Sequence, residues 1–165
     1  MGIKRIGKHL LLNRWRVRRA FPRQALANIE KAIKASEAAH SGQIRFAVEG
    51  ALDGAPLFRD QSARDRAIDV FGELRLWDTT HDNGVLIYLL LADRDVEIVA
   101  DRGLNAKVTH EEWEQVCRAM EAELRAGHHA PAVMEGVRRI ATLMARHFPP
   151  RAREENELPD RPAVL

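Results

Sequence analysis

The sequence has a single cysteine, few aromatic residues and no long apolar run. Cys117 alone can form no intramolecular disulfide and provides no set of thiolates for a structural zinc ion. No apolar stretch reaches the roughly 18 residues that span a bilayer, and residues 10–12 are too few for a secretory signal core, which takes about 7–15. With 165 residues, 45% of them apolar, we expect one globular domain that is not exported and is cytoplasmic.

Familiar catalytic motifs are also missing. The sequence contains no G-x-x-x-x-G-K-[ST] phosphate-binding loop, no G-x-S-x-G nucleophile turn and no H-E-x-x-H zinc motif. The local sequence therefore arranges no nucleophile. A hydrolase built on this chain would have to use a water molecule that is activated by a metal ion.

Acidic residues are absent from the first 23 positions. That segment carries a formal charge of +8, which leaves −6 on the rest of a chain whose total is +2. Three interpretations are open for the basic arm, residues 1–21: a solvated terminus, a segment that docks peripherally at the inner membrane on anionic lipid or a membrane partner, and a nucleic-acid-binding arm. Nucleic acid is the least favoured partner, because the rest of the chain is acidic. The candidate binding residues are Arg14, Arg16, Arg18 and Arg19, with Trp15 and Phe21 at the lipid interface.

Apolar residues recur at helical spacing in three segments of the first half of the chain. Residues 1–21 are expected to contain a short amphipathic helix. Residues 23–40 should form a second helix with Gly42 as its C-terminal cap. Ser62 and Asp65 resemble a capping box for a third helix that reaches about residue 76. The residues expected to be buried are Ile3, Ile6, Leu10 and Val17 in the first helix, Leu26, Ile29 and Ile33 in the second, and Ile68, Phe71 and Leu74 or Leu76 in the third.

Three further segments have the patterns of β-strands. Residues 43–49 alternate between apolar and polar side chains, as a half-buried strand does. Residues 85–92 are apolar at both parities, so we expect both faces of that strand to be covered. Asp93 and Arg94 form a tight turn into a returning strand at residues 96–100. Residues 50–61 and 77–83 are expected to be loops.

Two helices follow the strands. Thr109 and Glu112 make a capping box for residues 109–127, and Pro131 begins a last helix that ends before residues 149–150. This order predicts a parallel β-α-β unit and then an antiparallel hairpin. We therefore predict an α/β fold, a three-layer α/β/α sandwich around a small mixed β-sheet. The domain would span residues 22–148, between the basic arm and a disordered tail at residues 149–165.

Acidic, glycine-containing turns flank the apolar hairpin on both sides. If residues 93–94 form the whole hairpin turn, Asp101 faces Leu86 and Gly103 faces Gly84. The two flanking turns then meet at one end of the sheet. They consist of His81, Asp82, Asn83 and Gly84 before the first strand and of Asp101, Arg102 and Gly103 after the second.

These turns have two interpretations. Asp82, Asn83 and Asp101 offer hard oxygen ligands, which suit Ca²⁺ or Mg²⁺ better than zinc. His81 could add a nitrogen ligand or titrate near neutral pH. The structural alternative is that Asn-Gly and Asp favour turns through their own backbone preferences, without any ligand. The residues alone do not decide between a metal site and two turns.

The hairpin resembles that of the TPM domain family. The resemblance covers roughly residues 29–148, and its most specific part is the D-N-G-V-L segment at residues 82–86 with V-E-I at 96–98 and G-L at 103–104. The family includes the thylakoid acid phosphatase domain linked to photosystem repair and many bacterial envelope proteins. This sequence is similar to a bacterial branch of small, signal-less TPM proteins, often encoded beside exported TPM proteins and LemA-type membrane proteins. The resemblance implies an α/β/α sandwich.

The resemblance also implies a range of functions. Some members bind calcium or another divalent ion at acidic loops at one end of the sheet, some are acid phosphatases, and many act as binding or assembly modules. Asp101 stands where family members usually have the first glycine of G-x-G-L, and it could add a ligand or pair with Arg102 or Arg45. We expect a binding or assembly module of a membrane or envelope complex, with a LemA-type or second TPM protein as partner and Ca²⁺ or Mg²⁺ as the candidate cofactor. The alternative is a metal-dependent acid phosphatase of low specificity.

Overall fold

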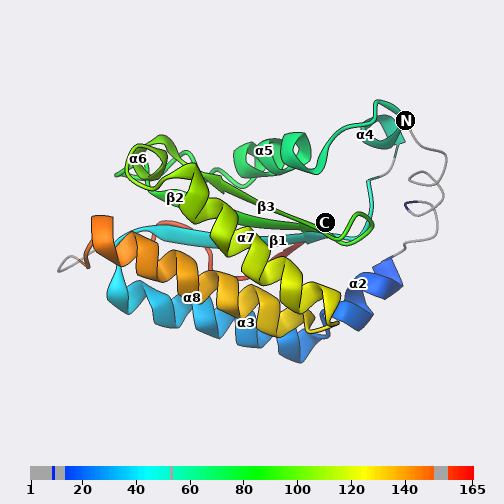
Figure 1. Cartoon of the computed structure of the whole chain (residues 1–165), viewed down its shortest axis with the longest axis horizontal. Coiled ribbons are helices and arrows are strands. Elements are labelled where there is room, and N and C mark those ends of the chain that lie inside the picture. The colour runs from blue at the N-terminus through cyan, green and yellow to red at the C-terminus, as the bar shows by residue number, and fades with distance from the viewer. Residues whose placement is uncertain (1–8, 10–13, 53, 151–155) are drawn as a thin grey trace.

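A four-stranded mixed sheet forms the centre of the molecule, with strand order β3-β2-β1-β4 (Figure 1). The computed structural model describes residue 9 and residues 14–52, 54–150 and 156–165. Strands β1 and β2 are parallel, β2 and β3 form an antiparallel hairpin, and β4 lies parallel to β1. Their bounds are Gln43–Glu49 for β1, Gly84–Leu90 for β2, Asp95–Ala100 for β3 and Ala163–Val164 for β4.

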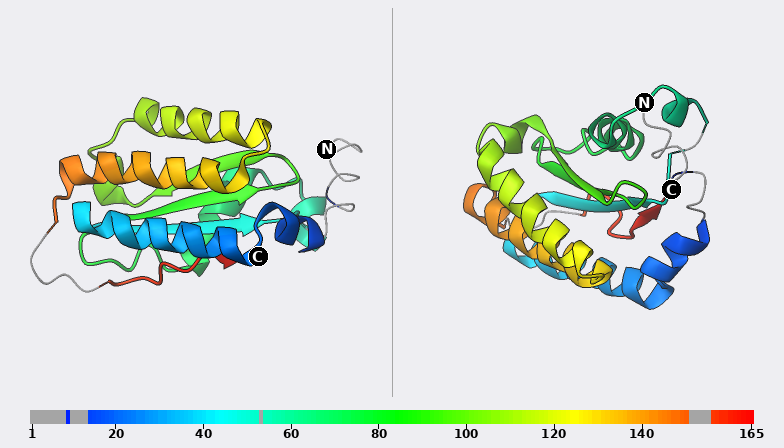
Figure 2. Two further views of the ribbon diagram at one scale, coloured as in Figure 1. Left: turned by 90° about the horizontal axis from the view of Figure 1, so that it is seen from below. Right: turned by 45° about the vertical axis from the view of Figure 1, so that its right-hand side comes forward.

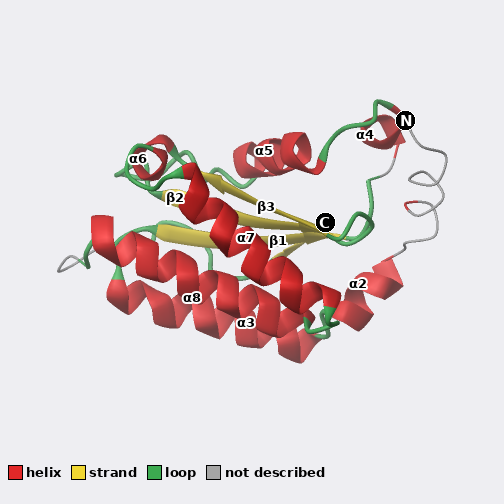
Figure 3. Cartoon of the chain, viewed as in Figure 1, coloured by secondary structure: helices red, strands yellow, loops and turns green. Residues whose placement is uncertain are grey.

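Helices cover both faces of this sheet, which confirms the predicted three-layer sandwich (Figure 3). One face packs against α3 (Arg23–Ser36), α7 (His110–Arg125) and α8 (His129–His147). The other packs against α5 (Ala63–Glu73), near the short helix α4 (Gly54–Phe58). All seven residues of β2 are buried, as its continuous apolar sequence predicts.

The capping box at Thr109 and Glu112 is present at the start of α7, as predicted. The end of α3 differs from the prediction. The chain leaves α3 at Ser36 through a 3₁₀ turn, Glu37–Ala39, so Gly42 caps no helix. A side chain at Gly42 would instead collide with Met144 of α8. Gly42 therefore allows the close approach of two elements.

The prediction of the buried face of α5 was wrong at Ile68, whereas Leu76 is buried and Phe71 and Leu74 pack against the core as expected. Ser62 caps the helix as expected, but Ala63, Ala67 and Val70 face the sheet, and Ile68 is 49% exposed. Positions 63, 67 and 70 lie at i, i+4 and i+7, which is one face of a helix. Small side chains on that face let the helix approach the sheet closely, so the larger Ile68 lies on the outer side.

The β2–β3 hairpin has a longer turn than predicted. Leu90 pairs with Asp95, so the loop includes residues 91–94, with Arg94 in the left-handed region at φ 57°. Asp101 consequently faces Gly84, and its N–H donates to the Gly84 carbonyl at 2.9 Å. The predicted register is wrong by two residues. Because the shift is even, every side chain keeps its predicted face, and both acidic turns still lie at the same end of the sheet.

The tail predicted to be disordered is ordered over residues 156–165. Strand β4 pairs with Ala47 and Val48 of β1, and the Leu165 N–H donates to the Val48 carbonyl at 3.0 Å. Figure 2 shows this last segment in red beside the sheet. A strand of two residues is too short to leave an alternating pattern, so the prediction failed where tertiary pairing with the edge of β1 decides the structure.

Part of the predicted basic arm belongs to the packed domain. Helix α2 (Arg14–Ala20) buries Val17, and Phe21 is 2% exposed against the ring of Phe46, with centroids 5.5 Å apart. The predicted boundary at residue 22 therefore lies inside packed structure, and Phe21 is not available for a lipid interface. Ile3, Ile6 and Leu10, which were predicted to be buried, lie outside the described residues.

Candidate functional site

The structure brings together most of the residues predicted at the end of the sheet. Asp82 adopts the left-handed conformation at φ 51°, and its carbonyl accepts the Gly103 N–H at 3.0 Å. A Cβ at Gly103 would lie 2.6 Å from the Asp82 carbonyl oxygen and 2.8 Å from that of His81. Only glycine fits there, so the two turns are closed against each other by backbone contact.

The Arg102 side chain lies where a cation bound to the Asp82 carboxylate would lie. Its Nε lies 3.0 Å from Asp82 Oδ2 and its Nη2 donates to Oδ1 at 3.1 Å, which is a bidentate pair. The hydrogen bond to Asp82 raises the pKa of the Arg102 guanidinium. The carboxylate predicted to hold a metal ion thus has an internal positive partner.

Asp101 has a structural role as the N-cap of the short helix α6 (Arg102–Asn105). Its Oδ1 accepts the Arg102 N–H at 2.7 Å, while its Oδ2 is buried without a hydrogen-bond partner. The Arg102 side chain forms its ion pair with Asp82. Asp101 is therefore neither paired with that guanidinium nor fully satisfied.

Asn83 faces a different set of residues. It is fully buried, its Nδ2 donates to the Ser41 carbonyl at 3.0 Å, and its N–H donates to Thr79 Oγ1 at 3.1 Å. These bonds tie the start of β2 to the segment before β1. Its Oδ1 has no hydrogen-bond partner, and the adjacent Gly84 leaves no room for a side chain beside the Leu76 carbonyl. Asn83 therefore connects the start of β2 to the segment before β1.

The side chains at this end do not converge as a cation site. Within the described parts of the chain, no group of three or more His, Cys, Asp and Glu residues could hold a metal ion. The Asp82 carboxylate faces Arg102, and the Asn83 amide faces Ser41. As arranged, these residues do not fit Ca²⁺ or Mg²⁺, so a metal at Asp82, Asn83 and Asp101 stays a prediction that would require Arg102 to move. His81 is half-buried beside them.

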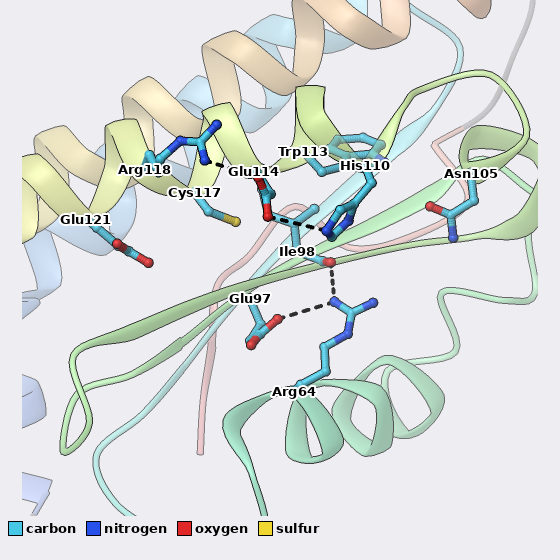
Figure 4. A pocket seen from close by; sticks show the side chains of 10 residues that line it. All are labelled: Arg64, Glu97, Ile98, Asn105, His110, Trp113, Glu114, Cys117, Arg118 and Glu121. Carbon is cyan, nitrogen blue, oxygen red and sulfur yellow. Dashed lines mark hydrogen bonds and ion pairs between the residues drawn. The ribbon is translucent and has the colours of Figure 1, made fainter.

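A groove that the sequence reasoning missed follows the outer edge of β3 (Figure 4). Its volume is about 630 Å³, and α5, α6 and α7 contribute side chains around the strand. The order of elements contained a signal for it, because a hairpin added to a parallel pair leaves its last strand at the edge. The lining residues are Arg64, Glu97, Ile98, Asn105, His110, Trp113, Glu114, Cys117, Arg118 and Glu121.

Charged side chains of both signs line the groove. Arg64 of α5 reaches over β3 and lies 3.4 Å from Glu97, while Glu114 of α7 pairs with His110 at 3.4 Å and with Arg118 at 3.1 Å. Burial and the neighbouring Asp95 raise the pKa of Glu97. The groove is therefore polar at its walls and has a strand backbone as its floor.

Cys117 is not an activated nucleophile in this groove. Burial raises the pKa of its thiol to about 12, and the carboxylates of Glu97 and Glu121 add to the effect. A reactive cysteine needs a lowered pKa, which a positive neighbour or a helix N-terminus provides. Cys117 therefore contributes to the wall of the groove as a thiol.

The arginines of the predicted arm lie far from the sheet end. Arg16, Arg18 and Arg19 are exposed on α2, at the opposite end of the molecule from α6 (Figure 1). Arg14 lies in the same helix. Among the described helices, none combines the length and the apolar character needed to cross a bilayer. The candidate residues thus fall into three separate places: the sheet end, the β3 groove and the surface of α2.

This arrangement defines an α/β/α sandwich domain with a closed sheet end and an open groove at one sheet edge. Residues 18–143 match the profile of the TPM domain, and the chain belongs to that family. It resembles the BA42 protein from the psychrophilic bacterium Bizionia argentinensis at 27% identity, over 86% of this chain and 93% of that one, with a TM-score of 0.75.

A more distant structure supports the fold alone. The N-terminal domain of a protein from P. gingivalis is 16% identical, with a TM-score of 0.58, over 75% of this chain and 76% of that chain. No curated protein matches the sequence at a significant level. The comparisons thus establish the family and the fold.

Proposed function

We propose that this TPM domain is a binding module that recruits a protein partner within a membrane or envelope complex. The observation that supports it most is the groove along β3, which is present in the free domain and is lined by charged and apolar groups from three helices and a strand. Preformed grooves with a few polar groups are the usual form of binding sites. By the family resemblance, a LemA-type protein or an exported TPM protein is the partner to test.

A direct binding assay tests this proposal. The full chain would be titrated against the soluble domain of a LemA-type protein and against an exported TPM protein, with binding followed by biolayer interferometry. We expect binding that weakens at least tenfold in Glu121→Arg, which reverses a charge in the groove, and that is unchanged in Glu111→Arg on the same helix. Equal binding by both variants would remove the groove from the interface, and no binding to either partner would refute the proposal for these partners.

The exposed arginines of α2 extend the proposal to the membrane surface. Each basic residue near an anionic bilayer contributes about 1 kcal/mol of attraction. Replacing Arg16, Arg18 and Arg19 together by glutamine should lower co-sedimentation with phosphatidylserine vesicles and have no effect with neutral vesicles. Sedimentation of the wild type that is equal on both kinds of vesicle would contradict a membrane role for α2.

A second candidate function is a metal-dependent phosphatase at the sheet end. The observation that favours it is the buried Oδ2 of Asp101, which has no hydrogen-bond partner. A divalent ion could be held there only if Arg102 left Asp82, and it would then supply an activated water. Turnover of p-nitrophenyl phosphate with Ca²⁺, Mg²⁺ or Mn²⁺ should then disappear in Asp82→Asn. Turnover that persists in this variant would place the activity elsewhere.

A further inference from the structure

The backbone of β3 presents hydrogen-bonding groups to the groove. Asp101 and Gly84 form a hydrogen-bonded pair, because the Asp101 N–H donates to the Gly84 carbonyl. Bonded and non-bonded pairs alternate along an antiparallel ladder. The N–H and C=O groups of Val96, Ile98 and Ala100 therefore point away from β2.

Side-chain contacts confirm this direction independently. Arg64 Nη1 donates to the Ile98 carbonyl at 2.5 Å, and Asn105 Nδ2 donates to the Ala100 carbonyl at 2.7 Å. The Cys117 sulfur lies beside the Ile98 N–H, which acts on the thiol as a hydrogen-bond donor. Two side chains thus stand where the N–H groups of a neighbouring strand would stand.

An incoming strand would have to displace the Arg64 and Cys117 contacts at Ile98. Natural proteins protect sheet edges with charged side chains, and Arg64 protects this one. Its side chain is 48% exposed, so it can leave the Ile98 carbonyl without crossing a packed core. Glu97 is its nearby ion-pair partner at 3.4 Å. An incoming backbone N–H could replace the guanidinium at little energetic cost.

The charge in the groove selects the occupant. Glu97 and Glu121 lie toward the β2–β3 hairpin, and Glu121 forms a long ion pair of 3.9 Å with Arg125 (Figure 4). Asp95 and Glu121 both act electrostatically on Glu97. A lysine or arginine at this end would relieve the repulsion among these carboxylates, while another acid would increase it.

We propose that the groove binds an extended peptide segment of a partner protein, which adds as a fifth strand to the edge of β3 and places a basic side chain between Glu97 and Glu121. This inference rests on the proposed binding function and names the class of ligand at the same site. Backbone hydrogen bonds to Val96, Ile98 and Ala100 provide the affinity, and the carboxylates provide the selectivity.

Peptides of defined chemistry test the inference. The probe alternates valine and threonine over about seven residues, is blocked at both termini and carries lysine at both ends. One twin carries glutamate at both ends, and a second twin has the lysines but is N-methylated at every backbone amide. Binding to the full, ¹⁵N-labelled chain would be followed by NMR, together with amide hydrogen exchange.

We expect the lysine peptide to slow exchange at Val96 and Ala100 by at least tenfold, and to have a smaller effect at Ile98, whose N–H already donates to Cys117. Glu97 and Val99 should not change, because β2 already bonds them. The N-methylated twin should not bind, and the glutamate twin should bind at least tenfold more weakly. Arg64→Ala should bind the lysine peptide more tightly, with Arg59→Ala as the matched control off the groove. Glu121→Gln should reduce the preference for lysine, and Glu111→Gln should not.

Two results would overturn strand addition. One is binding of the N-methylated twin as tightly as its parent, and the other is the absence of any protection at the three edge amides at saturating peptide. In either case the titration against folded partner proteins still tests the proposed function, since such a partner can use the groove walls without adding a strand. A result that refutes strand addition therefore does not by itself refute the proposed binding function.

Discussion

Removing the Tyr88 hydroxyl tests the buried polar network on the α5 face of the sheet. Tyr88 is fully buried, and its hydroxyl donates to Glu49 Oε2 at 2.7 Å. Glu49 also accepts from Arg66 Nε at 2.9 Å, and Arg66 continues to Glu73 at 2.8 Å. Burial and the Glu49 carboxylate raise the pKa of Tyr88, so the protonated hydroxyl is the donor to Glu49 at neutral pH.

Tyr88→Phe keeps the ring in place and deletes one hydrogen bond. A hydrogen bond to a charged group contributes about 1.5–3 kcal/mol. Because Arg66 still satisfies Glu49, we expect a loss at the lower limit, about 1.5 kcal/mol. For a domain of this size, 1 kcal/mol corresponds to about 2–4 °C in Tm. The expected shift is therefore about 4 °C downward.

Urea unfolding of the wild type, Tyr88→Phe, Glu49→Gln and the double variant measures the effect as a cycle. Residues in one hydrogen-bond network couple by about 0.5–3 kcal/mol. We expect a coupling of about 1 kcal/mol between these two positions. A loss from Tyr88→Phe below about 0.5 kcal/mol, or an equal loss with and without the Glu49 carboxylate, would refute the reasoning.

Three further predictions test other parts of the structure. Gly103→Ala should lower stability by about 2 kcal/mol through backbone collision with Asp82 and His81, whereas Gly72→Ala in α5, where a Cβ meets nothing within 4 Å, should raise it by about 0.5 kcal/mol; thermal unfolding compares the pair. Burial raises the pKa of Glu37 to about 7, and so does the hydrogen bond that protonated Glu37 donates to the Asp160 carboxylate. Protonated Glu37 favours docking of residues 156–165, so this stabilisation is complete below about pH 4.5 and is lost as the pH rises through 7. Glu37→Gln should remove that part of the pH dependence in urea unfolding at pH 5 and pH 8, and an unchanged dependence would contradict the assignment. Ile68→Gln should change stability by less than about 0.5 kcal/mol because Ile68 lies on the outer side of α5, and a loss above about 1.5 kcal/mol in urea unfolding would contradict the packing described here.

Local patterns predicted most of the fold. Strand β2 is apolar at both parities because helices cover both of its faces, and the Thr109 capping box begins α7 because its two side chains satisfy each other's backbone N–H groups. The parallel unit and the hairpin followed from the order of elements. In each case the residues that carry the pattern also make the stabilising contact, so sequence and structure agree.

The errors arose where a distant contact decides the structure. The apolar run continues into Leu91 and Ala92, so the strand seemed longer than the ladder that Leu90 and Asp95 close. Strand β4 has only two residues and exists because β1 offers an open edge. Ile68 is apolar but exposed, because small residues face the sheet. The periodicity of apolar residues within one segment does not show which distant segment that segment contacts.

The candidate site shows the same limit more sharply. The sequence placed Asp82, Asp101 and Arg102 at one end of the sheet, and the structure agrees. Which cation faces Asp82 depends on side-chain geometry. The spacing of Asp82 and Arg102 in the sequence does not predict their bidentate contact. Two acidic turns therefore predict that charged side chains lie close together, but they do not show whether the positive partner is a metal ion or an arginine.

The sheet end and the edge of β3 differ in what a ligand would have to displace. At the end of β2, glycines and Arg102 close the turns against each other, so a ligand would have to break an existing ion pair before it could bind. Along the edge of β3, the side chains of Arg64 and Asn105 occupy the carbonyls of Ile98 and Ala100, and the N–H groups of an incoming strand can replace them there. Both places hold an arginine ion pair, but the backbone contact between Asp82 and Gly103 closes the sheet end, whereas the β3 edge faces a groove. The β3 groove is therefore a better recognition surface than the acidic turns.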